Sequence, residues 1–245
     1  MGRYDGKPGS VLVDMSLMQS APDKKFPYLV ITGPHAQDCN KQGIPATADI
    51  ADLEDILDAT TSFITGLTAK VLTGTFTHNC DRLNYYYVKD TTGIRGALGR
   101  MYGRSYKAYN YTIKIKHDPE WITYRTFLYP DSAATRWMGY SKMIAGMMAK
   151  GDSLVKARDI KFDLYFRTDT DRNAFATFAK GKGYRTDSML ISQSTVAPYE
   201  IIVSKNAMVK METILASEDE MAEIVRKRRG FYYGWSAPLN SGSIK

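Results

Sequence analysis

Four side chains of types that ligate zinc lie in the first half of the 245-residue chain: His35, Cys39, His78 and Cys80. Imidazole and thiolate are common zinc ligands, but a His-x3-Cys pair combined with a His-x-Cys pair is not a familiar zinc spacing. The simpler interpretation is polar residues in surface loops, and we predict no metal. Because two cysteines are too few for a disulfide framework, we expect both as free thiols.

Catalysis by a nucleophile needs a serine or cysteine beside a base that is itself oriented by a third group. The three histidines, His35, His78 and His117, show no Ser-His-Asp or Cys-His arrangement at a strand-to-helix turn. Two glycine pairs, in residues 93–96 and 181–183, lack the Lys-Ser/Thr that completes a phosphate-binding loop. We therefore predict a protein that is not an enzyme and has no cofactor.

Residues 94–116 combine positive charge with aromatic side chains, since six basic residues and no acidic one are interleaved with tyrosines. Arg100, Arg104 and Lys107 follow the i, i+4, i+7 spacing of one helix face. Tyrosine rings can stack on bases, so this segment is the best candidate for binding RNA or single-stranded nucleic acid. A solvated helix face with tyrosines packed on a sheet explains the same pattern.

Composition bounds the remaining possibilities. The chain is 44% hydrophobic and 24% charged, which is typical of a globular protein. No run of roughly 18 apolar residues is present, and the first ten residues lack the apolar stretch of a signal peptide, so we expect a cytoplasmic protein that does not enter membranes. The net charge is +7, of which +2 lies in residues 1–130 and +5 in residues 131–245. This mild excess permits a nucleic-acid partner without requiring one.

Hydrophobic periodicity in the first half predicts strands and helices in a definite order. Helices are expected at 49–66 and 92–104, and strands at 10–17, 26–32, 70–77, 83–89 and 109–116. From residue 26 onward this is the βαββαβ order of a ferredoxin-like fold, with an antiparallel sheet and two helices on one face. Because the first two strands of that fold run parallel, the loop with His35 and Cys39 should meet the turn with His78 and Cys80.

The second half repeats this order behind an additional helix that begins at Thr135. Helices are expected at 170–181, capped by Thr170, and at 217–228, opened by a capping box at Ser217. Strands are expected at 159–167, 184–191, 199–204 and 231–235, and residues 118–132 form a last strand or covering arm plus a linker. We therefore predict an α+β protein of two tandem ferredoxin-like domains, residues 1–132 and 133–245.

The second half contains several short motifs that together resemble a known family. They are Gly151-Asp152, the strand 160–166, Gly181-Lys182-Gly183-Tyr184 and Tyr232-Tyr233-Gly234-Trp235. On these features, residues 135–237 resemble the bacterial regulator of ribonuclease E activity B, although Tyr233 stands where that family has an aspartate. The resemblance implies a ferredoxin-like, non-catalytic protein that binds and inhibits an RNA-degrading enzyme.

The first half is similar to a different family, domain-of-unknown-function family 695, to which no activity is attached. The residues that carry this similarity are Tyr4-Asp5-Gly6, the strand 11–17 with Ala21-Pro22, Leu53-Glu54-Asp55, Trp121, and Leu128-Tyr129-Pro130. This family occurs fused in front of the regulator-like domain, which matches the order of the two halves here.

These observations predict a bacterial regulatory module that binds another protein, with a ribonuclease as the candidate partner; the alternative is a nucleic-acid-binding protein that uses residues 94–116. Exposed aromatic side chains are the usual anchors of an interface. The candidate binding surface therefore consists of the tyrosine-rich strand, the basic helix face and the closing aromatic motif: Tyr85, Tyr86, Tyr87, Arg100, Arg104, Lys107, Tyr232, Tyr233 and Trp235.

Overall fold

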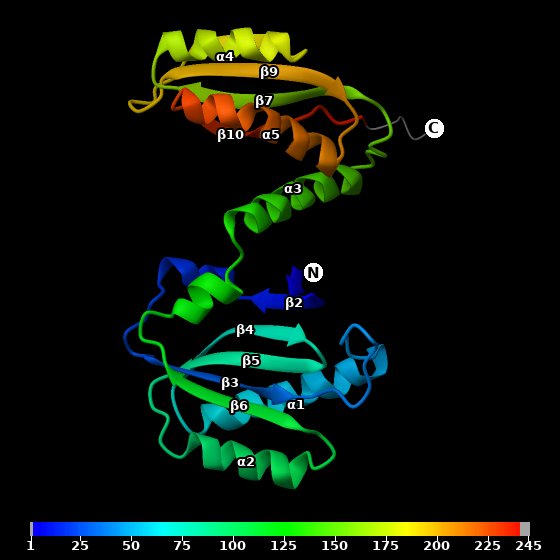
Figure 1. The fold of residues 1–245 in the computed structure, drawn as a ribbon, viewed down its shortest axis with the longest axis vertical. Helices are drawn as coiled ribbons and strands as arrows, with labels where there is room; N and C mark the ends of the chain where they lie inside the picture. The colour runs from blue at the N-terminus through cyan, green and yellow to red at the C-terminus, as the bar shows by residue number, and fades with distance from the viewer. Residues whose placement is uncertain (1, 241–245) are drawn as a thin grey trace. The chain divides into compact units, whose positions relative to one another are not determined.

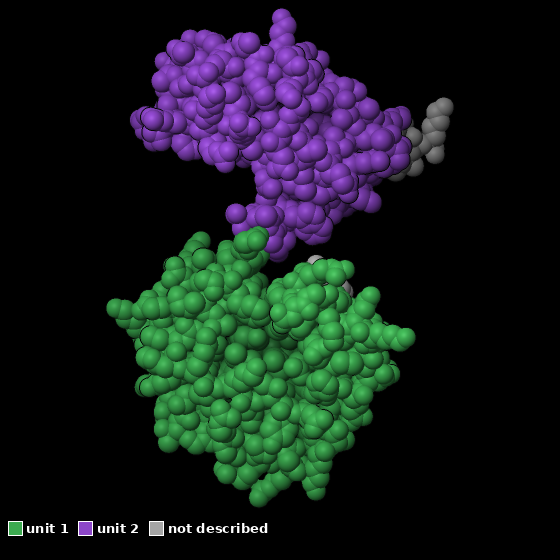
Figure 2. Space-filling model, viewed as in Figure 1, with its two compact units in different colours: residues 1–131 green, residues 132–245 purple. Residues whose placement is uncertain are grey.

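The computed structural model describes residues 2–240 and divides into two compact units, residues 1–131 and 132–245 (Figure 2). Each unit contains its own antiparallel sheet and helices, as the two α+β halves of the sequence predict. Within the described residues, no helix combines the length and apolar character that a membrane crossing requires.

Unit 1 is built on a six-stranded sheet with the order β1-β2-β4-β5-β3-β6 (Figure 1). Its strands are β1 (Gly2–Tyr4), β2 (Lys7–Val13), β3 (Tyr28–Pro34), β4 (Lys70–His78), β5 (Asp81–Val88) and β6 (Tyr111–His117). All neighbouring strands pair antiparallel. The last four strands of this order, β4-β5-β3-β6, form the ferredoxin-like sheet, and the β1–β2 hairpin extends it beyond β4.

Two helices, α1 (Thr47–Thr65) and α2 (Ile94–Ser105), cover one face of this sheet. Their buried side chains recur at helical spacing, as Ile56 and Ile64 do in α1, and Ile94, Leu98 and Tyr102 do in α2. They pack against strand residues that include Val30, Tyr86 and Val88.

The opposite face is covered by two short helical turns, a 3-10 helix (η1, Met15–Gln19) and a π-helix (η2, Tyr124–Leu128). Trp121 introduces η2 with a positive φ of 52°, and its ring stacks on the buried Tyr87 ring at a centroid distance of 4.2 Å. Of the two alternatives for residues 118–132, the covering arm is therefore correct. Both faces of the sheet are buried as a result.

A buried carboxylate holds this arm in place. Asp118 accepts hydrogen bonds from the Tyr87 hydroxyl at 2.7 Å and from the backbone nitrogens of Ile122 and Thr123 at 2.9 and 3.0 Å. Burial opposes ionisation of Asp118, but the hydrogen bonds outweigh it and keep its pKa below the usual value. The charged form is thus the one that the arm is built around.

Unit 2 has a four-stranded sheet with the order β10-β7-β9-β8, and all neighbours are again antiparallel. Its elements are α3 (Ser132–Ala149), β7 (Arg158–Phe166), α4 (Asp169–Gly181), β8 (Arg185–Ile191), β9 (Tyr199–Ala207), α5 (Met211–Lys227) and β10 (Phe231–Ser236). Numbered within the βαββαβ motif, both sheets have the strand order 4-1-3-2.

The core of unit 2 lies on one face of its sheet only. Alternate residues of β7, such as Phe162 and Leu164, are buried against helix residues that include Phe175 and Met221. Between them, Asp163 points to the other face and is only partly buried. Helix α3 packs onto the same core through Tyr140, Ile144 and Met147.

Two predicted helix starts in unit 2 are wrong. Thr168, not Thr170, caps α4, because its hydroxyl accepts a hydrogen bond from the Asp171 backbone nitrogen at 3.1 Å. Ser217 lies inside α5, where its side chain is buried. The helix begins six residues earlier, because Ile214 packs in the core one turn before Ser217 and extends the apolar face toward the N-terminus.

Candidate functional site

The tyrosine-rich strand of unit 1 does not form a binding surface. Tyr86 and Tyr87 are fully buried and Tyr85 is 6% exposed. They lie in β5, an interior strand of the six-stranded sheet, third from the β6 edge, and this sheet is covered on both faces. The expectation of exposed anchors is therefore wrong for all three.

Hydrogen bonds satisfy the hydroxyl of Tyr86 inside this core. It lies 2.7 Å from the Thr61 hydroxyl and accepts a hydrogen bond from the Asn84 amide at 2.8 Å. Burial raises its pKa to about 12, so the ring stays neutral. The sequence did contain a signal for this burial, because residues 83–88 lack the alternation of a half-exposed strand.

The basic segment 94–116 is divided by the structure into exposed cations and packed tyrosines. Arg100 and Arg104 are exposed on α2, whereas Lys107 lies beyond the end of this helix and does not continue its face. Tyr102 is fully buried, and its hydroxyl contacts that of Thr32 at 3.1 Å. Tyr111 stacks on Tyr102 at a centroid distance of 4.6 Å but remains 43% exposed, so Tyr102 is part of the core while Tyr111 stays partly accessible.

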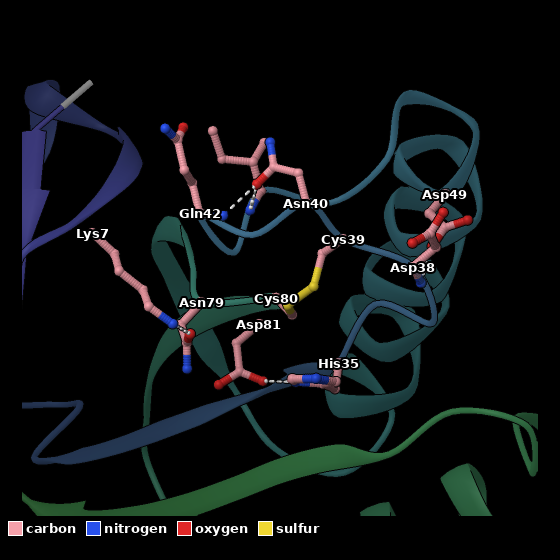
Figure 3. The surroundings of a disulfide bond; sticks show 11 residues. Lys7, His35, Asp38, Cys39, Asn40, Gln42, Asp49, Asn79, Cys80 and Asp81 are labelled. Carbon is pink, nitrogen blue, oxygen red and sulfur yellow. Dashed lines mark hydrogen bonds and ion pairs between the residues drawn. A yellow bond between two sulfur atoms is a disulfide. The ribbon is translucent and has the colours of Figure 1, made fainter.

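The predicted meeting of the His35–Cys39 loop with the β4–β5 turn is confirmed, but the free thiols are not. Cys39 and Cys80 form a disulfide with a Cα–Cα distance of 5.9 Å (Figure 3). The backbone brings them together, since the Ala36 nitrogen donates to the Cys80 carbonyl and the Cys80 nitrogen donates to the Gly43 carbonyl, both at 2.8 Å. Disulfides persist mainly in oxidising compartments, so the state of this pair in the host bears directly on the predicted cytoplasmic location.

The two histidines near this disulfide have separate partners. The Nδ1 atom of His35 lies 2.9 Å from a carboxylate oxygen of Asp81, as Figure 3 shows. The Nε2 atom of His78 lies 2.8 Å from the Tyr4 carbonyl. Within residues 2–240, no group of three or more His, Cys, Asp or Glu side chains is arranged to hold a metal.

The closing aromatic motif in β10 presents one exposed ring. Tyr233 is 79% exposed and meets Tyr165 edge to face at 5.8 Å. Trp235 is 5% exposed and packs against Tyr140 of α3, so its prediction as an exposed anchor is wrong. Tyr232 is half-buried. The pairing of β10 with β7 is interrupted by a β-bulge between Tyr232 and Gly234, which breaks the regular alternation of side chains. Trp235 therefore lies opposite the buried Phe162, while Tyr233 faces solvent.

A cavity of about 510 Å³ lies beside β10 and is lined by four arginines, one glutamate and several apolar side chains. Its lining residues are Arg136, Arg167, Glu218, Met221, Ala222, Val225, Arg226, Arg229, Gly230, Phe231 and Tyr232. We call this cavity the arginine hollow. A second, largely apolar cavity of about 370 Å³ shares Phe231 and Tyr232 with it and is also lined by Tyr165, Val196 and Tyr233.

The turn between α5 and β10 shapes the arginine hollow. Arg229 adopts a positive φ of 51°, and the Gly230 nitrogen donates to the Val225 carbonyl at 2.8 Å, which ends the helix. Gly230 passes so close to Phe166 that an added Cβ would lie 2.5 Å from its ring. A glycine is therefore required for the turn to place Arg229 and Phe231 at the cavity.

Sequence reasoning missed most of this cavity. Residues 226–229 show as a basic run, but at a helix C-terminus such cations also complement the helix dipole. Arg136 and Arg167 lie at least 59 residues before Arg226 in the chain, and only the folded structure brings them to the same place. No local pattern connects them.

Family comparisons cover both units. Residues 1–129 match a Family of unknown function (DUF695). The chain belongs to this family. Residues 139–237 of this DUF695 chain also match the family described as Regulator of ribonuclease activity B, so both resemblances seen in the sequence are confirmed. No curated protein matches the chain. A crystal structure of an unknown protein from Galdieria sulphuraria aligns with 87% of this chain and 99% of its own, at 5% identity and a TM-score of 0.23.

The two family matches coincide with structural features of the DUF695 chain. The first ends just after η2 and therefore includes the arm that covers the sheet. The second begins within α3 and ends one residue after β10, so it contains every residue of the arginine hollow except Arg136. The families matched are thus one of unknown function and one described as regulators of ribonuclease activity.

Proposed function

We propose that this protein is a non-catalytic regulatory module that acts by binding another protein, with unit 2 as the binding part and an RNA-degrading enzyme as the target. The observation that carries the proposal is the match of residues 139–237 to the Regulator of ribonuclease activity B family.

The distribution of accessible side chains supports this assignment to unit 2. Unit 1 buries the aromatic side chains of β5 on both faces of its sheet. Unit 2 leaves Tyr233 and Phe231 exposed at the edge of two neighbouring cavities. Partly exposed aromatic and arginine side chains are the residue types that most often dominate the energy of protein interfaces.

The test is affinity capture from a lysate of the native host with the full chain, followed by an assay of any captured ribonuclease. We expect a ribonuclease to be retained and its cleavage of a standard RNA to slow when the protein is added. Capture without a ribonuclease, or an unchanged cleavage rate, would refute the proposal.

A nucleic-acid-binding role is the second candidate, because Arg100, Arg104 and Lys107 are exposed and have no acidic partner among the described contacts. Binding through phosphates weakens steeply with salt, since each neutralised phosphate releases counterions. Anisotropy titrations with single-stranded RNA at low and moderate salt test this candidate. Absence of binding at low salt would remove it.

A further inference from the structure

We propose that the arginine hollow of unit 2 binds an acidic peptide segment that carries a large apolar side chain. The proposal deepens the proposed function and rests on it, because it names the chemistry of the partner. It predicts that the carboxylates of such a segment pair with arginines at the rim while its apolar side chain enters the cavity.

The arginines of the hollow converge from different elements. Arg136 belongs to α3, Arg167 follows β7, Arg226 lies in the last turn of α5, and Arg229 lies in the turn after it. The dipole of α5 accounts for cations at its C-terminal end, but not for Arg136 and Arg167, which come from other elements. Four guanidinium groups around one cavity form a site for anions.

Internal ion pairs leave most of the positive charge of the hollow without a carboxylate partner. Glu218 is the one acidic residue of the lining, and it is held by Arg136 at 3.2 Å and by the Tyr140 hydroxyl at 2.9 Å. Among the described contacts, no carboxylate pairs with Arg167, Arg226 or Arg229. Guanidinium groups bind carboxylates through paired hydrogen bonds, so three such groups remain available to a ligand.

The interior of the hollow is apolar. Met221 and Val225 are buried in the cavity wall, and Phe231 is 44% exposed at its edge. Methionine adapts its shape to different side chains, and a cavity of about 510 Å³ has room for a leucine or phenylalanine. The adjoining apolar cavity, reached across Phe231, extends this surface toward Tyr233. An apolar anchor flanked by acidic residues matches both properties.

A nucleic acid fits these features less well. The guanidinium of Arg167 lies over the Phe231 ring, 5.6 Å from its centroid, and therefore occupies a face on which a base would stack. The lining contains no Asn, Gln, Ser or Thr that could read the edge of a base. The geometry thus favours a peptide.

The test uses the full chain and a short fluorescein-labelled peptide of glutamates and aspartates around a central Leu-Phe pair, with anisotropy as the readout. The double variant Arg167→Gln/Arg229→Gln removes two unpaired cations of the hollow. We expect it to weaken binding roughly tenfold or more, because each lost charged contact leaves a carboxylate of the peptide without its partner. The matched control, Arg100→Gln/Arg104→Gln, removes the same charge from unit 1 and should leave binding unchanged.

Four further outcomes decide the proposal. A peptide with Ser-Ser in place of Leu-Phe should bind more weakly to the wild type. Absence of binding at low salt, an equal effect of the control variant, or a single-stranded oligouridine that competes through the same arginines would each overturn it.

Capture from the host lysate with the same double variant separates this proposal from the proposed function. If the wild type retains a ribonuclease and the variant retains it equally, the hollow is not the site and the regulatory function stands. If the wild type retains no ribonuclease but binds the acidic peptide through Arg167 and Arg229, the hollow stands and the regulatory function fails.

Discussion

The two units share one strand order but differ in how much of the sheet they bury. In unit 1, helices cover one face and the arm at residues 121–128 covers the other, so that aromatic side chains such as Tyr86 and Tyr87 become core. In unit 2, the core lies on one face, and Tyr165 and Tyr233 remain at the surface. The same topology therefore produces a sheet covered on both faces in one unit and a sheet with its core on a single face in the other.

The charge of the two units follows the same division. Of the net charge of +7, the segment after residue 130 carries +5. In unit 1, several exposed cations lie on the outer side of α2, whereas in unit 2 four arginines gather around one cavity. A modest excess of positive charge attracts anionic ligands more strongly when it is concentrated around a cavity than when it is spread over a surface. This contrast is what the following predictions test.

Truncating the Trp121 side chain, which holds the arm of unit 1 on its sheet, should have the largest effect on stability. Trp121→Ala deletes a ring that stacks on Tyr87 and a hydrogen bond of 3.0 Å from its indole nitrogen to the Phe26 carbonyl. We expect a loss of about 3 to 5 kcal/mol in the free energy of unfolding of unit 1. Denaturant unfolding of the full chain, followed by hydrogen exchange of each unit, measures it.

The matched control is Tyr233→Ala, which truncates a ring that is 79% exposed on unit 2. Its effect on stability should stay within about 0.5 kcal/mol, as for most surface substitutions. A similar loss for both variants would show that the two units do not differ in the way their aromatic side chains are used.

The disulfide should stabilise unit 1 alone, because both of the chain's cysteines, Cys39 and Cys80, lie in unit 1. It closes a loop of 41 residues, and restricting such a loop in the unfolded chain is worth roughly 2 to 4 kcal/mol. Cys39→Ser/Cys80→Ser should therefore lower the melting temperature of unit 1 and leave that of unit 2 unchanged.

The state of the cysteines in the host is a separate measurement. Thiols are blocked in intact cells, and the purified protein is analysed by mass spectrometry without reduction. We expect the intact pair. Two alkylated cysteines would contradict the disulfide and would support the expected cytoplasmic location.

The sequence predicted the fold of both units because alternation and helical periodicity are local. Residues 158–166 alternate cleanly and form β7, and the turn at residues 78–81 forms the predicted hairpin. The topology also predicted that Cys39 and Cys80 lie close together, but it did not predict the disulfide bond between them.

The candidate site was mostly beyond such reasoning. Whether Tyr86 is exposed depends on Thr61 and Asn84, which pack around it only after folding. Arg136 and Arg167 share a cavity because α3 and the end of β7 both lie beside β10. Side chains brought together by tertiary contacts leave no spacing in the sequence.

Asp163 lies on the sheet face of unit 2 that is opposite the core, and its ionisation should make the stability of unit 2 depend on pH. Burial, together with the nearby Glu200 carboxylate, raises the pKa of Asp163 to about 6. The folded state then holds a proton that the unfolded chain releases near pH 4, so stability falls as the pH rises from about 4 to 6. Asp163→Asn should remove this loss and stabilise unit 2 by about 1 kcal/mol at pH 7, after allowing for solvent screening.

Asp187 supplies the control of opposite sign on the same sheet. Burial opposes its charge, but hydrogen bonds from Arg185 and Ser204, both at 2.8 Å, keep its pKa below the usual value. Its stabilising contribution is present above the unfolded pKa and is lost as the pH falls. Asp187→Asn should therefore destabilise unit 2 at pH 7 but not near pH 3. Identical pH profiles for the two variants would contradict both assignments.

The smallest expected effect comes from separating the units. Unit 2 has its own core around Phe162, Phe175 and Trp235, and α3 packs on that core through Tyr140. Residues 132–245 should therefore unfold cooperatively on their own, with a melting temperature close to that of unit 2 in the full chain, and should bind the acidic peptide with the same affinity. Calorimetry and anisotropy measure the two quantities. A fragment that is insoluble, or that binds the peptide much more weakly than the full chain does, would show that unit 1 contributes to the site and that the two units do not divide scaffold and recognition between them.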